Sequence, residues 1–177
     1  ASVVIPINNR PEFIGPAIES VQRQTVKNVE AIVVVNGGPN DPTIAEAKRY
    51  AEGGDLYNPS KPQVRVLVLD INNIGLCLNM GCQAARGKYY FQLDSDDQLT
   101  DDAVEKALKV FREDDRIGMV IGSYEVWKKD PATGELTRVF AEKGYAASGL
   151  AEIAERAGVN KRLVYYYFPD GRSELFK

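Results

Sequence analysis

Short apolar runs alternate along this chain with stretches that carry helix signals. The apolar runs cover residues 2–6, 31–35, 64–69, 89–93 and 118–127. The stretches between them begin with helix-start residues such as Pro11, Pro42 and Thr100, and they cover residues 11–24, 42–52, 75–86 and 101–112. Apolar strands that alternate with helices are typical of a parallel sheet covered on both faces. The sequence therefore predicts an α/β fold with a mainly parallel sheet.

Two details of the predicted helices can be checked against a structure. Phe13, Ala17, Val21 and Gln24 are spaced to share one face of the first helix. Asp41 is predicted to cap the second helix, and Thr100 is predicted to cap the helix over 101–112.

Polar residues follow the first, second and fourth predicted strands. Since ligands of parallel sheets bind at the carboxyl ends of the strands, these loops form the predicted binding edge. The polar residues that the edge is expected to bring together are Asn8, Asn9, Arg10, Asn36, Asp94 and Asp96.

The segment Asp94-Ser95-Asp96-Asp97 is the sharpest chemical signal in the chain. Hard divalent cations such as Mg²⁺ or Mn²⁺ take carboxylate oxygens and fill their remaining positions with diphosphate oxygens and water. One or two acids at a strand end therefore suffice for a metal that neutralises a departing diphosphate. The alternative is a solvated acidic turn that precedes a helix.

The motifs around this segment resemble family 2 glycosyltransferases with a Rossmann-like GT-A fold. The resemblance covers residues 1–128 and rests on motifs that occur in order, namely residues 2–11, 19–25, 31–38, 73–75, 79–81 and 85–97. It implies a nucleotide-diphosphate-sugar donor, a divalent metal (Mn²⁺ or Mg²⁺) and an acceptor that the sequence does not identify.

The resemblance also implies roles for individual residues. The loop from Ile7 to Arg10 would lie against the nucleoside. Asn36 would lie near the base and Asp94 near the ribose. Asp96 would bind the metal, and Asp97 is the alternative metal ligand. The full set implied to bind the nucleotide sugar is Pro6, Asn8, Asn9, Arg10, Asn36, Asn73, Gly75, Asn79, Asp94 and Ser95, and the set implied to bind the metal is Asp96, Asp94 and Asp97.

The chain departs from the family pattern at two places. The usual Asp-Asp-Gly-Ser after the second strand is Asn36-Gly37-Gly38-Pro39, and the usual Ala-Arg-Asn-x-Gly is residues 77–81, Cys-Leu-Asn-Met-Gly. The second change removes an arginine that contacts the donor, and both Arg86 and Arg10 are candidates to replace it.

The later part of the chain does not match the family's acceptor half, which would supply the catalytic base. Glu125 and Asp130 are candidate substitutes, although their positions favour surface charges of a β-hairpin over 125–140. We therefore expect donor and metal binding with weak or absent sugar transfer, or an inactive scaffold, and we assign no catalytic residue.

Residues 140–176 resemble the helix-turn-helix headpiece of TetR-type transcriptional regulators. This resemblance divides the chain into a truncated GT-A domain, 1–138, and a small α-helical segment, 139–177, as in a chimera. The residues that it implies for DNA binding are Asn160, Lys161, Arg162, Tyr165 and Tyr166. The alternative is that these helices pack on the sheet as a lid or cap. Residues 136–140 fit two interpretations, the second strand of the hairpin or the end of a helix.

The amino-acid composition excludes several kinds of catalytic and metal site. The chain contains no histidine, which excludes Ser-His-Asp catalysis and histidine metal ligands. Cys77 and Cys82 are read as buried small apolar residues and not as a disulfide. With no apolar run of about 18 residues, the sequence predicts a soluble, cytoplasmic protein, and it leaves a homo-oligomer open.

Overall fold

The central sheet contains four parallel strands. The structure is a computed structural model that describes residues 1–122, 127–129 and 136–138. The strands are β1 (Ser2–Ile7), β2 (Glu30–Val35), β3 (Gln63–Val68) and β4 (Tyr90–Gln92), in the order β3-β2-β1-β4. All three strand pairs are parallel, which confirms the predicted sheet.

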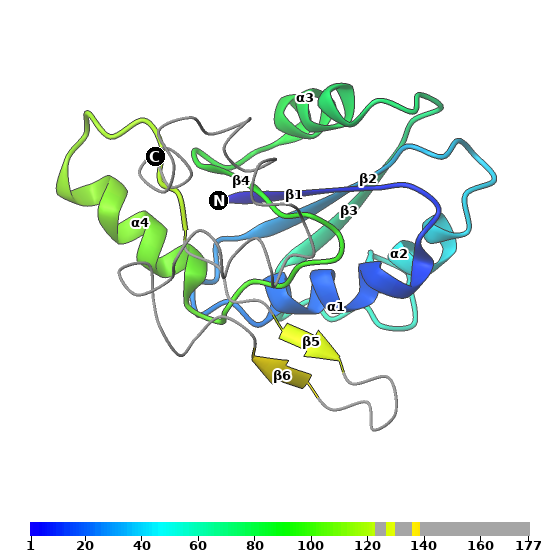
Figure 1. Cartoon of the computed structure of the whole chain (residues 1–177), viewed down its shortest axis with the longest axis horizontal. Coiled ribbons are helices and arrows are strands. Elements are labelled where there is room, and N and C mark those ends of the chain that lie inside the picture. Colours follow the sequence, from blue (N-terminus) through cyan, green and yellow to red (C-terminus); the bar gives the residue numbers. More distant parts are fainter. Residues whose placement is uncertain (123–126, 130–135, 139–177) are drawn as a thin grey trace, which may run out of the picture. The chain divides into compact units, whose positions relative to one another are not determined.

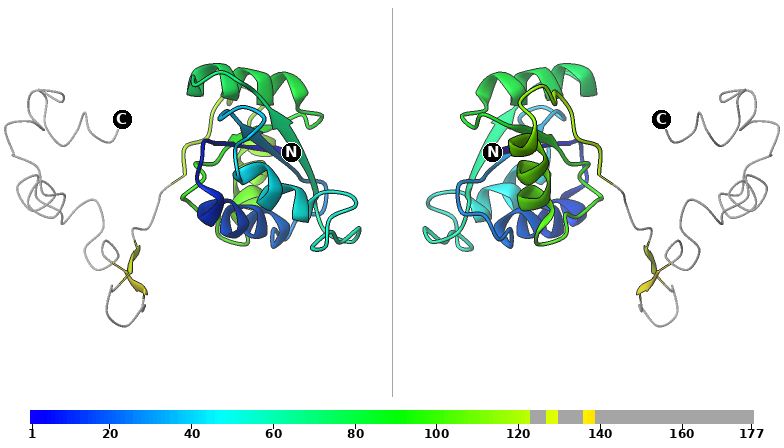
Figure 2. Two further views of the ribbon diagram at one scale, coloured as in Figure 1. Left: turned by 90° about the vertical axis from the view of Figure 1, so that its right-hand side faces the viewer. Right: turned by 90° about the vertical axis from the view of Figure 1, so that its left-hand side faces the viewer.

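Helices cover both faces of this sheet, as Figures 1 and 2 show. One face packs against α1 (Pro11–Gln22), α2 (Thr43–Tyr50) and α4 (Ala103–Glu113), and the other packs against α3 (Ile74–Ala84). The central strands β1 and β2 are buried along their whole length, because side chains on both of their faces meet helices.

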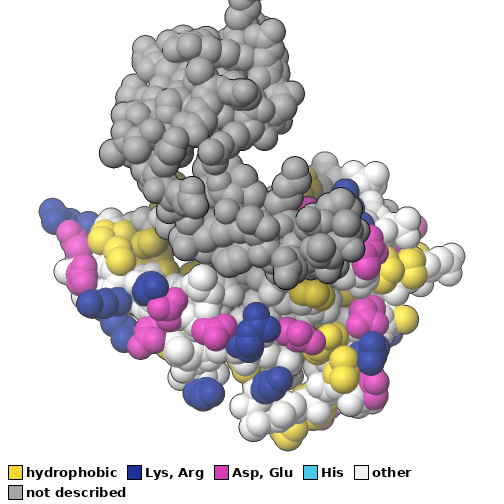
Figure 3. Space-filling view, turned by 60° about the horizontal axis from the view of Figure 1, so that its bottom comes forward, with side chains coloured by type: hydrophobic (Ala, Val, Ile, Leu, Met, Phe, Trp, Pro, Cys, Tyr) yellow, Lys and Arg dark blue, Asp and Glu magenta, His cyan; other side chains and the backbone are white. Residues whose placement is uncertain are grey.

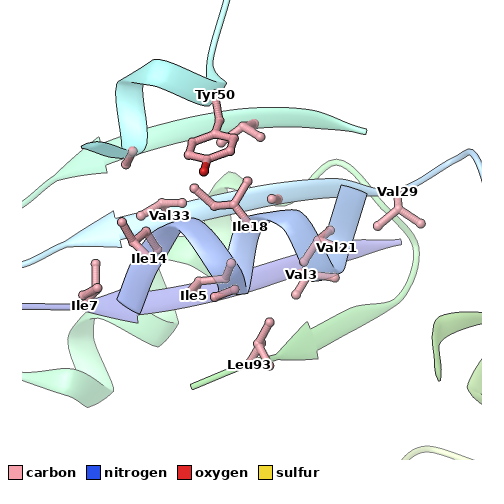
Figure 4. Packing of buried hydrophobic residues seen from close by; sticks show 14 of the residues in the cluster. Val3, Ile5, Ile7, Ile14, Ile18, Val21, Val29, Val33, Tyr50 and Leu93 are labelled. Carbon is pink, nitrogen blue, oxygen red and sulfur yellow. The ribbon is translucent and has the colours of Figure 1, made fainter. Parts of the chain in front are cut away.

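The larger core lies between α1 and the sheet (Figure 4). Ile14 and Ile18 of α1 pack over Ile5 of β1 and Val33 of β2, and Tyr50 of α2 closes one side. With Ala17 and Val21, the two isoleucines form the stripe at i, i+3, i+4 and i+7 that a helix needs to cover a sheet. The predicted face was wrong at Phe13, whose side chain remains 39% exposed, because the stripe is centred one residue further along.

The second core lies under α3 and depends on a glycine. Cys77 packs there with Val4, Ile32 and Val34. A Cβ added to Gly81 would lie 2.4 Å from Val4 Cγ1, so the close approach of α3 to the sheet requires a residue without a side chain. Cys77 is buried as predicted, whereas the prediction was wrong for Cys82, which is exposed; both thiols are free.

A buried polar network joins the amino ends of β1 and β2 to the segment before β4, and we call it the amino-edge network. Glu30 accepts hydrogen bonds from Ser2 Oγ (2.7 Å), the Arg86 N–H (2.8 Å) and Arg65 (3.1 Å). The Gly87 N–H donates to Ser2 Oγ at 2.9 Å. These bonds fix the position at which the chain enters β4.

The first part of the apolar run, residues 118–122, does not extend the sheet. No strand forms over residues 118–122, and Met119 and Ile121 remain 75% and 78% exposed. The prediction of a fifth strand in this sheet was wrong there, because an apolar run becomes a buried strand only where a neighbouring strand and a helix cover it.

A second compact unit covers residues 123–177, and the first covers residues 1–122. In the second unit, β5 (Trp127–Lys129) pairs antiparallel with β6 (Leu136–Arg138), which confirms the predicted hairpin and places residues 136–138 in a strand. Residues 139–177, to which the helix-turn-helix interpretation applies, lie outside the described residues. Among the described helices, none has the length and apolar character needed to cross a membrane.

Candidate functional site

The chain reverses its direction of strand addition between β3 and β4. It adds β2 and β3 on one side of β1 and then returns to place β4 on the other side. The loops after β1 and β4 therefore leave the sheet from adjacent strands, and the helices that follow them, α1 and α4, pack on the same face of the sheet. Binding sites of open α/β sheets lie at such switch points.

The loop after β1 is tied to the loops that follow β2 and β3. Asn8 Nδ2 donates to Asn72 Oδ1 at 3.1 Å, beyond the end of β3. The Asn9 N–H donates to Asp41 Oδ2 at 2.8 Å, and the Arg10 N–H donates to Thr43 Oγ1 at 3.1 Å. Asn9 has φ = 50°, a left-handed conformation that asparagine tolerates better than most residues.

Asp41 organises these loops as well as the start of α2. Its Oδ1 accepts from the Thr43 N–H at 2.8 Å, which confirms the predicted cap. Burial by itself would raise the pKa of Asp41, but hydrogen bonds from Thr43, Asn9 and Gly37 outweigh burial and lower that pKa below its ordinary value. The carboxylate is therefore a charged structural anchor within the candidate site.

Asn36 lies at the end of β2 with an unsatisfied amide. Only 7% of the residue is exposed, and its Oδ1 has no hydrogen-bond partner among the residues that the structure describes. The backbone around it is fixed, since the Asn36 N–H donates to the Ile7 carbonyl at 2.9 Å and the Gly38 N–H donates to the Leu69 carbonyl at 3.0 Å. Gly38 has φ = +80°, which explains why the family's glycine is retained at this turn.

The acidic segment after β4 faces the β1 loop. Arg10 Nη1 lies 3.6 Å from Asp96 Oδ2, and this ion pair joins the two loops. Asp94, Asp96 and Asp97 are exposed, and Ser95 is half-buried. Burial raises the pKa of Asp97 above its ordinary value, and the charges of Asp96 and Asp94 raise that pKa further.

The position of the acidic segment is fixed from α1. Gln24 is 1% exposed, and its Nε2 donates to the Thr100 carbonyl (2.7 Å) and to the Ser20 carbonyl (3.1 Å). Its Oε1 accepts from the Val104 N–H at 3.0 Å, so Gln24 caps α4. Ser20 Oγ accepts from the Leu99 N–H at 3.1 Å, two residues after Asp97.

These bonds correct one prediction about α4. Thr100 was predicted to cap this helix, but its hydroxyl instead donates to Asp102 Oδ1 at 3.1 Å. The bond to the start of α4 comes from Gln24, just after the end of α1, which accepts from the Val104 N–H, while the N-cap side chain of α4 makes no capping bond.

The remaining predicted residues lie on neighbouring elements. Pro6 is buried within β1, opposite Val34 of β2. Asn73 begins α3, and its Oδ1 accepts from the Leu76 N–H at 3.0 Å, while Gly75 and Asn79 are exposed on the same helix. A structural capping role thus accounts for Asn73 Oδ1.

Of the two arginines considered for the donor, only Arg10 is at this edge. Arg86 belongs to the amino-edge network, where its N–H donates to Glu30 and its side chain lies 3.5 Å from Gln63 Oε1. Gln63 and Glu30 begin β3 and β2, so Arg86 lies at the opposite ends of the strands.

The acidic segment suits a divalent cation that is shared with a ligand. Within the described part of the chain, no three His, Cys, Asp or Glu side chains converge as a metal-binding group, so Asp94, Asp96 and Asp97 do not form a three-carboxylate cage. One or two carboxylates are nevertheless the protein ligands that Mg²⁺ uses when phosphate oxygens and water complete its shell.

Three long-range contacts of the site were not predicted from the sequence. The contacts of Gln24 with α4, of Asp41 with Asn9 and of Asn72 with Asn8 all join residues that are far apart along the chain. Only Asp41 carried a local sequence signal, because Asp-Pro-Thr is typical of a helix start. That signal did not reveal the hydrogen bond between Asp41 and Asn9.

The strand order of the four-stranded parallel sheet and the helices on both of its faces define a Rossmann-like α/β protein with a GT-A-like fold. The family model for "Glycosyl transferase family 2" matches residues 2–161, and the chain belongs to that family. The match continues past residue 138, where the sequence analysis placed a domain boundary, so that boundary stays a prediction.

Individual relatives agree with this assignment. The chain is 34% identical over 113 residues to chondroitin synthase of Escherichia coli, which covers 64% of this chain and 15% of the synthase. It is 34% identical over 119 residues to hyaluronan synthase of Pasteurella multocida, which covers 67% of this chain and 11% of the synthase. The chain thus spans a small part of the length of these relatives.

Solved structures show the same fold. S. aureus TarS 1–349 in complex with UDP matches with a TM-score of 0.54 at 23% identity, over 63% of this chain and 32% of TarS. The UDP-GlcNAc complex of the same protein matches with a TM-score of 0.53 at 22% identity, over 63% of this chain and 31% of TarS.

Proposed function

We propose that this chain is the donor-binding part of a glycosyltransferase that uses a nucleotide-diphosphate sugar and a divalent cation. The observation that carries the proposal is the contact between the β1 and β4 loops at the carboxyl edge of the sheet, where Arg10 lies 3.6 Å from Asp96. Family membership and the UDP-bound complexes of TarS support a uridine nucleotide as the first candidate.

The base of the nucleotide would meet Asn36. A buried amide oxygen without a partner is costly, and a ligand N–H can supply the missing hydrogen bond. The other predicted donor contacts, from Asn8, Asn9, Asn73, Asn79 and Asp94, remain part of this proposal.

Asp96 and Asp94 would hold the cation, Mn²⁺ or Mg²⁺, with Asp97 beside them. When bound, the cation neutralises charge on the diphosphate leaving group. Bonds of Gln24 and Ser20 hold the backbone at Thr100 and Leu99, in the segment that follows these carboxylates.

The acceptor and the catalytic base are not assigned. Glu125 and Asp130, the candidate bases from the sequence, lie outside the described residues. The alternative function, DNA binding by Asn160, Lys161, Arg162, Tyr165 and Tyr166, also falls outside them. The comparisons lend it no support, and a gel-shift assay at low salt would test it.

The test is a thermal-shift and calorimetric titration of the protein with UDP and GDP, each with and without Mn²⁺. Specific binding at about 100 times Kd stabilises the folded state by about 2.7 kcal/mol. Asp96→Asn should remove the Mn²⁺-dependent part of this gain. The matched control is Asp101→Asn, at an exposed aspartate that pairs with Arg23 and lies outside the acidic segment.

Two results would contradict the proposal. One is that neither nucleotide stabilises the wild-type protein in the presence of Mn²⁺. The other is that Asp96→Asn retains the full Mn²⁺-dependent gain while its melting temperature without ligand equals that of the control.

A further inference from the structure

The four carboxyl-edge loops carry a strongly unbalanced charge. Residues 8–10, 36–42, 69–73 and 93–102 contain one basic residue, Arg10, and seven aspartates, at positions 41, 70, 94, 96, 97, 101 and 102. A diphosphate brings further negative charge, so these loops can accept it only together with cations. Arg10 is the cation that the loops themselves provide.

Several of the seven aspartates already have hydrogen-bond or ion-pair partners other than Arg10. Asp41 is held by backbone and hydroxyl donors, Asp101 pairs with Arg23, and Asp102 pairs with Lys106 at 2.7 Å. Asp96 is different, because its ion-pair partner is Arg10.

The ion pair between Arg10 and Asp96 is long and exposed, so either side chain can change its partner. The separation is 3.6 Å, and the two side chains are 57% and 52% exposed. Ion pairs of this kind contribute little stability, so a divalent cation can take the carboxylate at small cost. The guanidinium would then stay near the β1 loop, because its carbon lies 5.9 Å from the centre of the Phe13 ring and the Arg10 backbone N–H is bonded to Thr43.

We propose that Arg10 binds the donor diphosphate, and that Arg10 pairs with Asp96 before the metal and the nucleotide bind. A guanidinium suits this role, since its planar fork can donate two hydrogen bonds to phosphate oxygens. Arg10 thereby takes the place of the donor-contacting arginine that the family has elsewhere, and Arg86, at the opposite ends of the strands, does not. This inference rests on the proposed function.

The proposal predicts effects of opposite sign for the metal and the nucleotide. Arg10→Gln should strengthen binding of Mn²⁺ alone by about two- to fivefold, because a competitor for Asp96 is gone. At saturating Mn²⁺ it should weaken UDP binding by about tenfold, the scale of one charge-assisted contact. UMP, which lacks the second phosphate, should lose less than about twofold.

Free Mn²⁺ is measured by electron paramagnetic resonance, and UDP and UMP binding by calorimetry, on the full chain. Arg10→Lys should give intermediate UDP affinity, since it retains the charge without the fork. Arg23→Gln is the matched control, because it removes an exposed arginine–aspartate pair from the other end of α1, and it should leave all three affinities within about twofold of wild type.

An unchanged or weaker Mn²⁺ affinity in Arg10→Gln would overturn the resting contact on Asp96. Equal losses for UDP and UMP, or no loss for UDP, would overturn the diphosphate contact. Absence of UDP binding by the wild-type protein with Mn²⁺ is a distinct outcome that overturns the proposed function and this inference together.

Discussion

At the scale of single residues, Glu30 shows how one buried charge is accommodated in this fold. Burial by itself would raise the pKa of Glu30, but hydrogen bonds from Ser2, Arg86 and Arg65, with the charge of Arg65, outweigh burial and lower that pKa. A carboxyl group whose pKa is lower in the folded state stabilises the fold above its unfolded pKa, about 4.3. That contribution disappears as the pH falls through the folded pKa.

Glu30→Gln should therefore destabilise the protein at pH 7 by roughly 1–3 kcal/mol, the scale of hydrogen bonds to a charged group. The difference from wild type should shrink as the pH falls below the unfolded pKa of about 4.3, because the unfolded wild-type chain then gains a proton that the folded carboxylate does not yet bind. Urea denaturation at pH 7 and pH 3.5 measures both values. Glu52→Gln, at an exposed glutamate, is the control, and a difference that is constant with pH would contradict the assignment.

Single residues also show what the sequence could predict about the site. Asp94, Asp96, Asn36 and Arg10 were identified because each follows an apolar strand, and the structure brings them to one edge of the sheet. Their binding roles stay proposals. Both Arg10 and Arg86 were left open in the sequence analysis, and the structure separates them, because Arg86 bonds to Glu30 at the amino ends of the strands.

At the scale of elements, the positions of the strands and helices follow local sequence patterns closely, whereas their exact ends do not. The parallel strands and the four helices of the first unit lie where periodicity predicts them, within about two residues. The failures were the strand over 118–122, the face of α1 at Phe13 and the cap of α4 at Thr100. Each depends on a neighbour that is distant along the chain.

The contact between α1 and α4 yields a prediction at this scale. Gln24→Ala should destabilise the protein by about 2–4 kcal/mol, because three hydrogen bonds are lost and the buried Val104 N–H is left without an acceptor. Gln24→Glu retains that acceptor but turns a carboxylate toward the Ser20 and Thr100 carbonyls. It should therefore recover stability as the pH is lowered and the carboxyl gains a proton.

Chemical denaturation at pH 7 and pH 5 separates these variants. Gln83→Ala, at an exposed glutamine of α3, should change stability by less than about 0.5 kcal/mol. Wild-type stability in Gln24→Ala would show that the contact does not hold α4 in place.

At the scale of the whole molecule, the first unit contains a complete core of its own. Both apolar clusters, one on each face of the sheet, lie within residues 1–122. Figure 3 shows basic and acidic side chains interspersed on one face of these residues, without a large area of a single sign. Such a surface suits a folded domain better than a polyanion-binding one.

A fragment of residues 1–122 should therefore fold by itself, with a cooperative thermal transition and helical circular dichroism. If the proposed function is correct, it should also bind UDP and Mn²⁺ as tightly as the full chain. Ile18→Asp in the fragment is the control for cooperative folding, because an unpaired charge in the core should prevent it. A fragment without a cooperative transition would show that its core needs the second unit.

The order of the strands has a consequence for how the chain acquires its structure. Ser2 pairs with Glu30 early in the sequence and with Tyr90 much later, so the β1–β4 contact closes the longest loop in the sheet. During synthesis, β1, β2 and β3 can assemble while one side of β1 is still open. The acidic segment gains its place only when that side is filled, and the ability to recognise a donor is therefore among the last properties to emerge as this chain matures.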